Sequence, residues 1–220
     1  MRVAAGAIAK KVLKEKLGLV IDSAVTAIGP VSTNVYDPVF ARENPFNFSD
    51  KDKVSEIKAL MDDIIAKHDS CGAVVEVRAH HVPIGIGSPV FDRLDAKLAY
   101  AMMGINAAKG VEIGDGFLLS QTKGSESRDE ITKDGFLSNH QGGILGGIST
   151  GQDIIVKLAL KPTSSILIPG KTIDINGNET SIVTKGRHDP CVGIRAVSIA
   201  EAMMALVLLD LYMEHKAQCL

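Results

Sequence analysis

The most restrictive feature of this sequence is an apolar segment close to its C-terminal end. Residues 199–213 contain only two charged side chains, Glu201 and Asp210, so a helix built from them is apolar on nearly every side. The segment is also shorter than the roughly 20 apolar residues that a membrane span needs. We therefore predict a helix that is buried between layers of the fold or between subunits and is not a membrane anchor.

Hydrophobic periodicity predicts further helices and strands in mixed order. Helices are expected over residues 2–17, 49–67, 88–104 and 198–216, the last three with N-caps at Ser49, Ser88 and Ser198. Strands are expected over residues 19–28, 73–82 and 152–160, a strand or turn over 110–116, and a hairpin around Gly177. Residues 29–47, with three prolines, are predicted to form one long loop. This order of elements indicates an α+β fold rather than a doubly wound sheet.

One predicted strand has a polar face. In residues 73–82, apolar side chains alternate with Glu76, Arg78 and His80, so one side of the sheet is expected to meet solvent or polar partners. His80 and His81 could also bind a metal ion. Neighbouring strand residues point to opposite faces, however, and no third ligand has motif spacing, so we favour a structural role.

Net charge and cysteine use argue against several classes of protein. The 24 basic and 26 acidic residues give a formal charge of −2, which provides no reason to expect a nucleic-acid or membrane partner, so any anion specificity must be local. The cysteines, Cys71, Cys191 and Cys219, form no CxxC pair and are read as free thiols of a reducing compartment. With no evident signal peptide, we expect a cytoplasmic protein.

A glycine-rich segment is the strongest local irregularity. Five of the ten residues 142–151 are glycine, and such a run lets backbone amides approach a ligand closely. A flexible loop or a set of bulges between strands explains the composition equally well. Two residues before this run, within the segment 138–151, His140 is a candidate acid or base, although an exposed loop histidine is the commoner case.

Two basic segments follow the glycine-rich one. Residues 161–165 offer one ammonium group and three hydroxyls, and residues 185–190 combine Lys185, Arg187, His188 and Asp189. Each alone is more typical of a polar turn. As a set they suit a polyanionic ligand, with amides and hydroxyls around phosphate, Arg187 as a fixed guanidinium fork and Asp189 as a proton acceptor or hydrogen-bond partner.

These segments together resemble the chorismate synthase family, and the match runs along essentially the whole chain. The segments that carry it are residues 110–117, 138–151, 161–165 and 185–191. Residues 2–8 are similar to the segment that follows the family's Ser-Ala-Arg-Glu-Thr motif. The resemblance implies an α+β sandwich of β-sheets and α-helices, with residues 1–220 forming a single domain that is truncated at its N-terminus.

The resemblance also implies an activity. Members of the family eliminate phosphate from 5-enolpyruvylshikimate 3-phosphate in an anti-1,4 sense to give chorismate, the last step of the shikimate pathway, as homotetramers that use reduced FMN. It implies FMN contacts from Asn106, Ala107, Gly146, Lys161, Pro162, Thr163, Ser164, Ser165 and Arg187. Asp189 is similar to the catalytic aspartate that handles a proton near flavin N5. Whether NADPH or an external reductase reduces the flavin, and whether Arg187 faces flavin or substrate, stays open.

Parts of the family pattern do not occur in this sequence. They include the Gly-Glu-Ser-His-Gly motif with its catalytic histidine, a second catalytic histidine and the Arg-Ser-Ser-Ala segment that contacts FMN. For this chain alone we expect weak flavin binding and little turnover, because groups that act as a unit are missing. The alternative function is therefore an inactive truncated chain that keeps the fold and the oligomer interface. An unrelated phosphate-binding module would require the whole set of motifs to match by coincidence.

Overall fold

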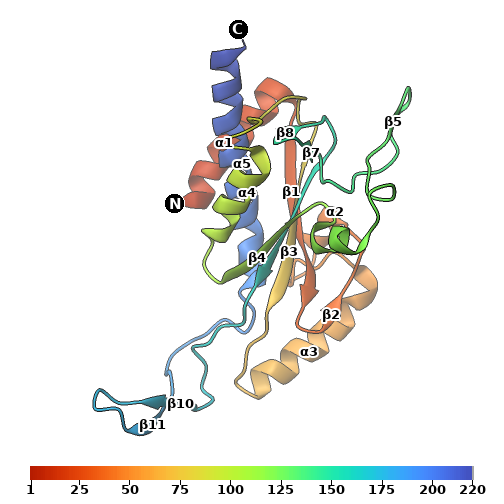
Figure 1. Ribbon diagram of the computed structural model, residues 1–220. Helices are drawn as coiled ribbons and strands as arrows, with labels where there is room; N and C mark the ends of the chain where they lie inside the picture. The colour runs from red at the N-terminus through yellow and green to blue at the C-terminus, as the bar shows by residue number, and fades with distance from the viewer. Residues whose placement is uncertain (220) are drawn as a thin grey trace.

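A five-stranded antiparallel sheet forms the centre of the molecule (Figure 1), in a computed structural model that describes residues 1–219. The strand order is β2-β1-β3-β9-β4, and every neighbouring pair is antiparallel. The strands are β1 (Val20–Ile28), β2 (Val31–Ser32), β3 (Ala73–His80), β4 (Ala108–Ile113) and β9 (Ile154–Leu160). Helices lie between these strands in the sequence, which confirms the predicted α+β class.

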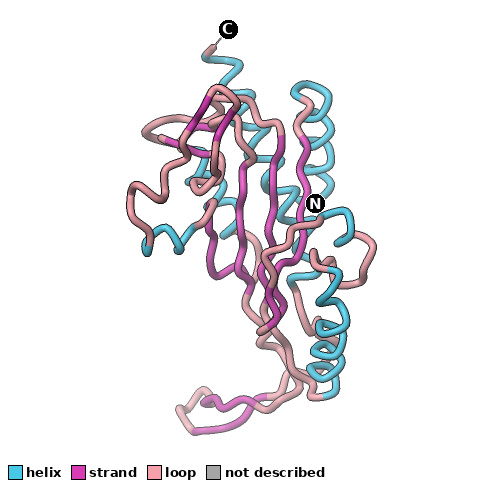
Figure 2. Tube along the Cα trace, turned by 90° about the vertical axis from the view of Figure 1, so that its right-hand side faces the viewer, coloured by secondary structure: helices cyan, strands magenta, loops and turns pink. Residues whose placement is uncertain are grey.

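Three helices, α1 (Arg2–Leu17), α4 (Leu94–Met103) and α5 (Gly193–Gln218), lie along one face of the sheet (Figures 1 and 2). The alternation predicted for β3 explains why the helices cover this face, since the apolar side chains of the strand point toward them. Val75 and Val77 are fully buried, whereas Arg78 and His80 on the opposite face are only half-buried. The fourth long helix, α3 (Val54–Ala66), lies near β2 at one end of the sheet.

The apolar C-terminal segment is a core helix. By length and composition α5 could cross a membrane, but it packs against α1, α4, β1 and β3. Ala200, Met204, Ala205 and Leu208 are at most 1% exposed. The predicted burial between layers is therefore confirmed on its sheet side.

The contact between α1 and α5 depends on small residues. A Cβ atom added at Gly6 would lie 2.3 Å from the Cβ of Ala202, closer than two carbon atoms can approach. Likewise, a Cβ at Gly193 would lie 2.3 Å from the Cβ of Ala73. Glycine at these positions lets α5 lie close to both α1 and the sheet.

All three predicted N-caps are wrong. The Ser49 hydroxyl donates to the Val35 carbonyl at 2.7 Å, and Asp50 caps a 3-10 turn that precedes α3. Ser88 lies in an irregular stretch against the Gly147 turn, and α4 begins only at Leu94. Ser198 lies inside α5, which begins at Gly193. A distant carbonyl, a packed turn and an earlier helix start therefore replace the three local capping patterns.

The predicted long loop over residues 29–47 is only partly irregular. It contains β2 and the short helix α2 (Pro38–Ala41). The Asp37 carboxylate caps α2 by accepting the amides of Val39 and Phe40 at 3.1 and 2.9 Å. Pro38 can begin this helix because the amides of the first turn have no partner within the helix, so its missing N–H costs no hydrogen bond.

Three short hairpins complete the fold. β10 (Gly170–Ile173) and β11 (Glu179–Ile182) form the hairpin predicted around Gly177, and it projects from the body as an arm whose residues are all exposed (Figure 1). β5 (Ile131–Thr132) pairs with β6 (Gly135–Phe136). β7 (Ile144–Leu145) pairs with β8 (Ile148–Ser149) within the glycine-rich segment. The 3-10 helix η2 (Gly116–Gln121) follows β4.

Candidate functional site

Two of the predicted flavin-contacting segments meet at one end of the sheet. Because β4 and β9 are antiparallel neighbours, the residues before β4 lie beside those after β9. The Lys161 amide donates to the Ala107 carbonyl at 2.9 Å. Ala107 has φ of 69°, a left-handed conformation that is uncommon without glycine and is often found at functional sites.

A hydrogen-bonded chain joins this junction to Asp189. The Thr163 hydroxyl donates to the Asp189 carbonyl at 3.2 Å, and the Ser70 hydroxyl donates to the Thr163 carbonyl at 2.6 Å. The Asp189 carboxylate in turn lies 3.1 Å from the guanidinium of Arg195 in the first turns of α5. The fold thereby brings the Lys161 and Asp189 segments together although they are far apart in the sequence.

A cavity of about 450 Å³ opens beside this junction. Asn106, Ala107, Asp189 and Arg195 line it, together with the start of α1 and apolar residues of α5. The lining combines one carboxamide and one carboxylate with two guanidinium groups, of Arg2 and Arg195, and an apolar wall, which is typical of a site for a small polar molecule.

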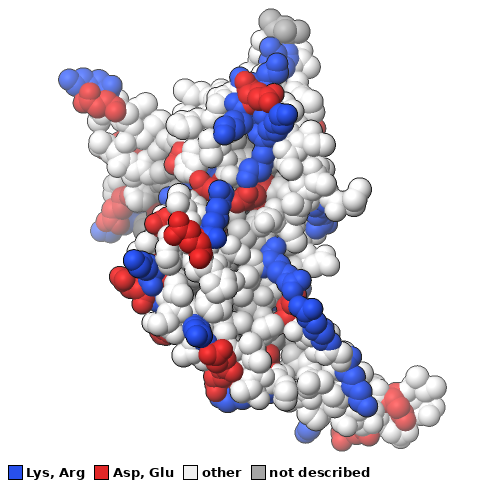
Figure 3. Space-filling model, turned by 180° about the vertical axis from the view of Figure 1, so that it is seen from behind, with Lys and Arg blue, Asp and Glu red and all other residues white. Residues whose placement is uncertain are grey.

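The remaining residues of the two basic segments lie largely in solvent. Lys161, Pro162, Ser164 and Arg187 are exposed, and Thr163 and Ser165 are half-buried. Arg187 follows the β10–β11 arm, and seen from behind, Lys and Arg side chains form a row that runs toward this arm (Figure 3). Residues 161–171 and 185–195 carry five Lys or Arg and one Asp, so this surface is locally basic although the chain as a whole is not.

Gly146 lies at the opposite end of the sheet from the other predicted flavin contacts. It is exposed in the β7–β8 turn, where Gly146 and Gly147 have φ of 62° and 89°, as a two-residue hairpin turn of this kind requires. The hairpin precedes the first residue of β9, whereas Lys161 follows the last, so roughly 20 Å of strand separate them. One chain does not bring Gly146 to the cavity.

Carboxylates organise the rest of the glycine-rich segment. Asp129 accepts hydrogen bonds from the Ser138 hydroxyl and from the amides of His140 and Gln141 at 2.6 to 2.9 Å. The His140 ring bonds to Asp115 at 2.6 Å. His140 is thus fixed by a structural partner and lies away from the 450 Å³ cavity, which it does not line.

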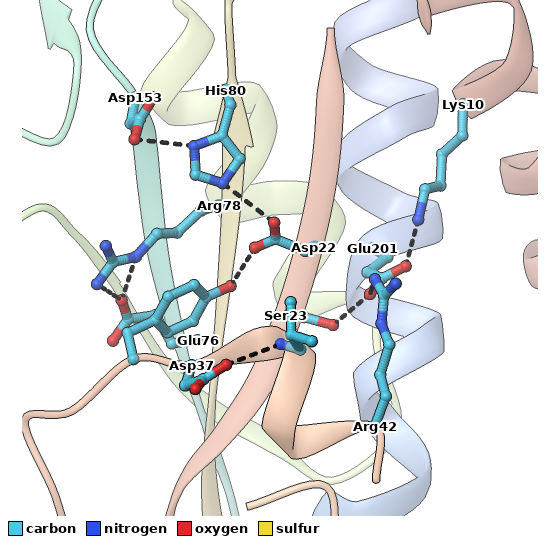
Figure 4. A network of polar contacts seen from close by, with 12 residues as sticks. Lys10, Asp22, Ser23, Asp37, Arg42, Glu76, Arg78, His80, Asp153 and Glu201 are labelled. Atoms are coloured by element: carbon cyan, nitrogen blue, oxygen red, sulfur yellow. Dashed lines mark hydrogen bonds and ion pairs between the residues drawn. The ribbon is translucent and has the colours of Figure 1, made fainter. Parts of the chain in front are cut away.

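The open face of the sheet carries a polar network that the sequence only partly predicted. His80 bonds to Asp153 at 2.9 Å and to Asp22 at 3.1 Å, and the Tyr36 hydroxyl donates to Asp22 at 2.6 Å (Figure 4). Arg78 stacks 3.9 Å from the centre of the Tyr36 ring. The alternation in β3 pointed to this face, but nothing local in the sequence linked it to Asp22, Tyr36 or Asp153.

Ser23, which follows Asp22 in β1, belongs to a second polar network on the helix-covered face of the sheet (Figure 4). Ser23 donates to Glu201 of α5 at 2.8 Å, and Glu201 also pairs with Lys10 and, at 3.6 Å, with Arg42. Within residues 1–219, no group of three His, Cys, Asp or Glu side chains is placed to hold a metal ion. The two carboxylate partners of His80, Asp153 and Asp22, fit a structural role.

Comparisons with known proteins give a consistent result. A protein-family model described as "Chorismate synthase" matches residues 1–213. A solved structure entitled "Crystal Structure of Chorismate Synthase" is similar to this chain, with a TM-score of 0.81 and 33% sequence identity. The match covers 97% of this chain and 62% of the solved chain, so this chain spans less than two thirds of that relative's length.

Proposed function

We propose a role in chorismate synthesis for this chain, which belongs to the chorismate synthase family. The reaction is the elimination of phosphate from 5-enolpyruvylshikimate 3-phosphate, with reduced FMN as cofactor. The observation that supports it most directly is the junction of Ala107, Lys161, Thr163 and Asp189 beside one cavity. These are segments that the family resemblance assigns to flavin and proton handling.

The residues around the cavity fit a flavin nucleotide. A volume of about 450 Å³ lies within the range of roughly 300–1,000 Å³ that small-molecule sites occupy. Asn106 and the backbone at Ala107 line the cavity and offer groups for the polar edge of a ring system. Outside its lining, the basic segments offer cations and hydroxyls for a phosphate, from Lys161, Thr163, Ser164 and Arg187. Pro162 and Ser165 complete the same segment. When bound, reduced FMN supplies the electron transfer that the elimination requires.

The residues of this chain would neutralise the charge of the phosphate groups and position the Asp189 carboxylate. The exposed Lys161 and Arg187 stabilise negative charge, including that which develops on a departing phosphate. Arg195 holds the Asp189 carboxylate at 3.1 Å, so that one oxygen is fixed while the other remains able to accept a proton. Asp189 is therefore our candidate for the group that handles the proton lost in the elimination.

The position of Gly146 supports a site that is completed by a second subunit. If Gly146 contacts FMN, it must do so in a neighbouring copy, because β9 separates it from Lys161 in its own chain. This supports the homotetramer that the resemblance implies. The three cysteines, all free thiols, support a reducing compartment, and we place the enzyme in the cytoplasm.

Anaerobic turnover with chemically reduced FMN tests the proposal. We would compare this chain alone, the chain joined to the part of the relative that has no counterpart here, and the Asp189→Asn form of the joined chain. We expect turnover from the joined chain and a loss of about 100-fold or more in the Asp189→Asn variant, with FMN binding retained. Absence of both FMN binding and turnover in a folded joined chain would contradict the assignment.

A non-catalytic chain that keeps the fold and the oligomer interface is the second candidate. The observation that favours it is that this chain spans 62% of the solved relative. Assembly of this chain with full-length subunits, without FMN binding or turnover by the joined chain, would support it over the first proposal.

A further inference from the structure

Two buried thiols lie beneath the candidate site. Cys71 precedes β3, and Cys191 directly follows Asp189 and Pro190. The Cys71 amide donates to the Pro190 carbonyl at 2.8 Å, and both thiols are buried. With standard bond lengths, this amide contact holds the two Cα atoms within about 7 Å of each other, near the upper limit that a disulfide tolerates.

The two thiols differ in reactivity because their surroundings differ. The hydrogen bond from Cys71 lowers the pKa of Cys191, and the amides of Gly193 and Ile194 at the start of α5 lower this pKa further against the effect of burial. The contact with Cys191 and burial raise the pKa of Cys71. Cys191 is therefore the more acidic of the two thiols, and the thiolate is the form that reacts with electrophiles.

We propose that Cys71 and Cys191 are a peroxide-responsive dithiol that closes to an intramolecular disulfide at the base of the candidate cofactor site. The Cys191 thiolate attacks one oxygen of hydrogen peroxide, the O–O bond breaks, and the products are a Cys191 sulfenic acid and hydroxide. The Cys71 sulfur then attacks the Cys191 sulfur and releases water. In total two thiols and one peroxide give one disulfide and two waters, so the thiols lose two electrons and the peroxide gains them.

The disulfide would connect segments that hold the site. The turn before β3 already contacts both of them, since Ser70 bonds to Thr163 and Cys71 to Pro190. A Cβ at Gly72 would lie 2.7 Å from the Leu160 carbonyl, so this turn is also closely packed against the end of β9. Oxidation would tie residues 189–191 to this turn covalently and restrict Asp189. That consequence rests on the proposed function, whereas disulfide formation itself does not.

Peptide mapping tests disulfide formation directly. The Cys219→Ser chain, which removes the exposed thiol, would be treated with hydrogen peroxide, blocked with a thiol reagent and digested with trypsin without reduction. Cleavage after Lys67, Arg78, Arg187 and Arg195 releases residues 68–78 and 188–195, each with one cysteine. We expect these two peptides as a linked pair that dithiothreitol separates. Cys191 oxidised to sulfinic acid without a linked pair, or two thiols that remain unoxidised, would overturn the proposal.

Single substitutions identify the order of the two steps. In Cys71→Ser, we expect a Cys191 sulfenic acid that a dimedone probe labels, and in Cys191→Ser we expect no labelling of Cys71. Equal labelling in both variants would contradict the assigned roles. Circular dichroism checks that Cys71→Ser and Cys191→Ser fold. If either variant does not fold, the peptide map of Cys219→Ser still tests disulfide formation. Titration of FMN with reduced and oxidised forms of the joined chain carrying Cys219→Ser then tests the proposed function separately: a linked pair in a joined chain that binds no FMN supports the dithiol and counts against the cofactor site.

Discussion

The Tyr36 hydroxyl lies on the open face of the sheet, where it donates to Asp22 at 2.6 Å. Burial and this hydrogen bond raise the pKa of Tyr36 above its ordinary value. In the unfolded chain Tyr36 ionises near pH 10, while in the folded chain it stays neutral. The contribution of Tyr36 to stability is therefore fully present below about pH 10 and decreases as the pH rises above that value.

The Tyr36→Phe variant should lose this pH dependence. Between about pH 10 and pH 11 the free energy of unfolding of the unsubstituted chain should fall more steeply than that of Tyr36→Phe, by up to about 1.4 kcal/mol per pH unit. Urea unfolding at several alkaline pH values measures the difference. Tyr100→Phe is the matched control because Tyr100 is 85% exposed. Parallel curves for Tyr36→Phe and the unsubstituted chain would show that Tyr36 ionises normally.

Glu201 is the charged residue on which the α1–β1–α5 packing depends. It accepts the Ser23 hydroxyl at 2.8 Å and pairs with Lys10 and Arg42, and its side chain is 14% exposed. Glu201→Ala should lower the free energy of unfolding by about 1–3 kcal/mol, because Lys10 would lose its partner in a half-buried site. Urea unfolding measures this loss. Glu15→Ala, which breaks an exposed pair with Lys11 at 3.9 Å, should change stability little; equal effects would contradict the role of burial.

At the residue scale, the sequence predicted burial better than it predicted partners. The alternation in residues 73–82 predicted the half-buried polar face of β3 correctly, because the period of a strand is a local property. The caps at Ser49, Ser88 and Ser198 were wrong because a distant carbonyl, a packed turn and a longer helix compete for those positions. Glu201, three residues after the predicted cap at Ser198, binds Lys10 of α1, a contact that no local pattern contains.

At the scale of elements, Gly6 sets the distance between α1 and α5. A methyl group there would lie 2.3 Å from the Ala202 Cβ, so the helices must separate. Gly6→Ala should therefore destabilise the protein by about 1–3 kcal/mol, although alanine favours a helix over glycine by about 1 kcal/mol. Thermal or urea unfolding measures it. Gly124→Ala, where an added Cβ meets nothing within 4 Å, is the control, and a stabilising Gly6→Ala would show that the helices are not closely packed in solution.

Most elements were predictable because each is encoded by its own periodicity. α1, β1, β3 and β9 have the expected positions within two residues at each end, and α5 begins five residues earlier than expected. The short β7–β8 hairpin was not separable from a flexible loop, since its glycines allow both and its pairing depends on contacts with residues 83–87. The structure of that segment is therefore fixed by its packing against residues 83–87 and not by its glycine content.

At the scale of the whole molecule, the sequence grouped the candidate site but could not arrange it. The segments around Asn106, Lys161 and Asp189 do meet, because β4 and β9 are antiparallel neighbours. Gly146 lies at the far end of β9, as its position before the predicted strand over residues 152–160 requires, although the resemblance groups it with residues that follow that strand. Cys71, which contacts the Asp189 segment, belongs to none of the motifs that carried the resemblance.

The β10–β11 arm is our candidate for contact with another subunit. It projects from the body with Ile173 at 65% and Ile175 fully exposed, and isolated two-stranded hairpins are marginally stable in water. If the arm packs against another subunit of the proposed tetramer, Ile173→Thr combined with Ile175→Asn should shift the assembly to smaller species at unchanged helix content. Analytical ultracentrifugation measures the mass, and Asn176→Asp in the same turn is the control. An unchanged tetramer would assign the interface elsewhere, and a monomeric unsubstituted chain would contradict the proposed assembly and leave Gly146 without a route to a flavin site.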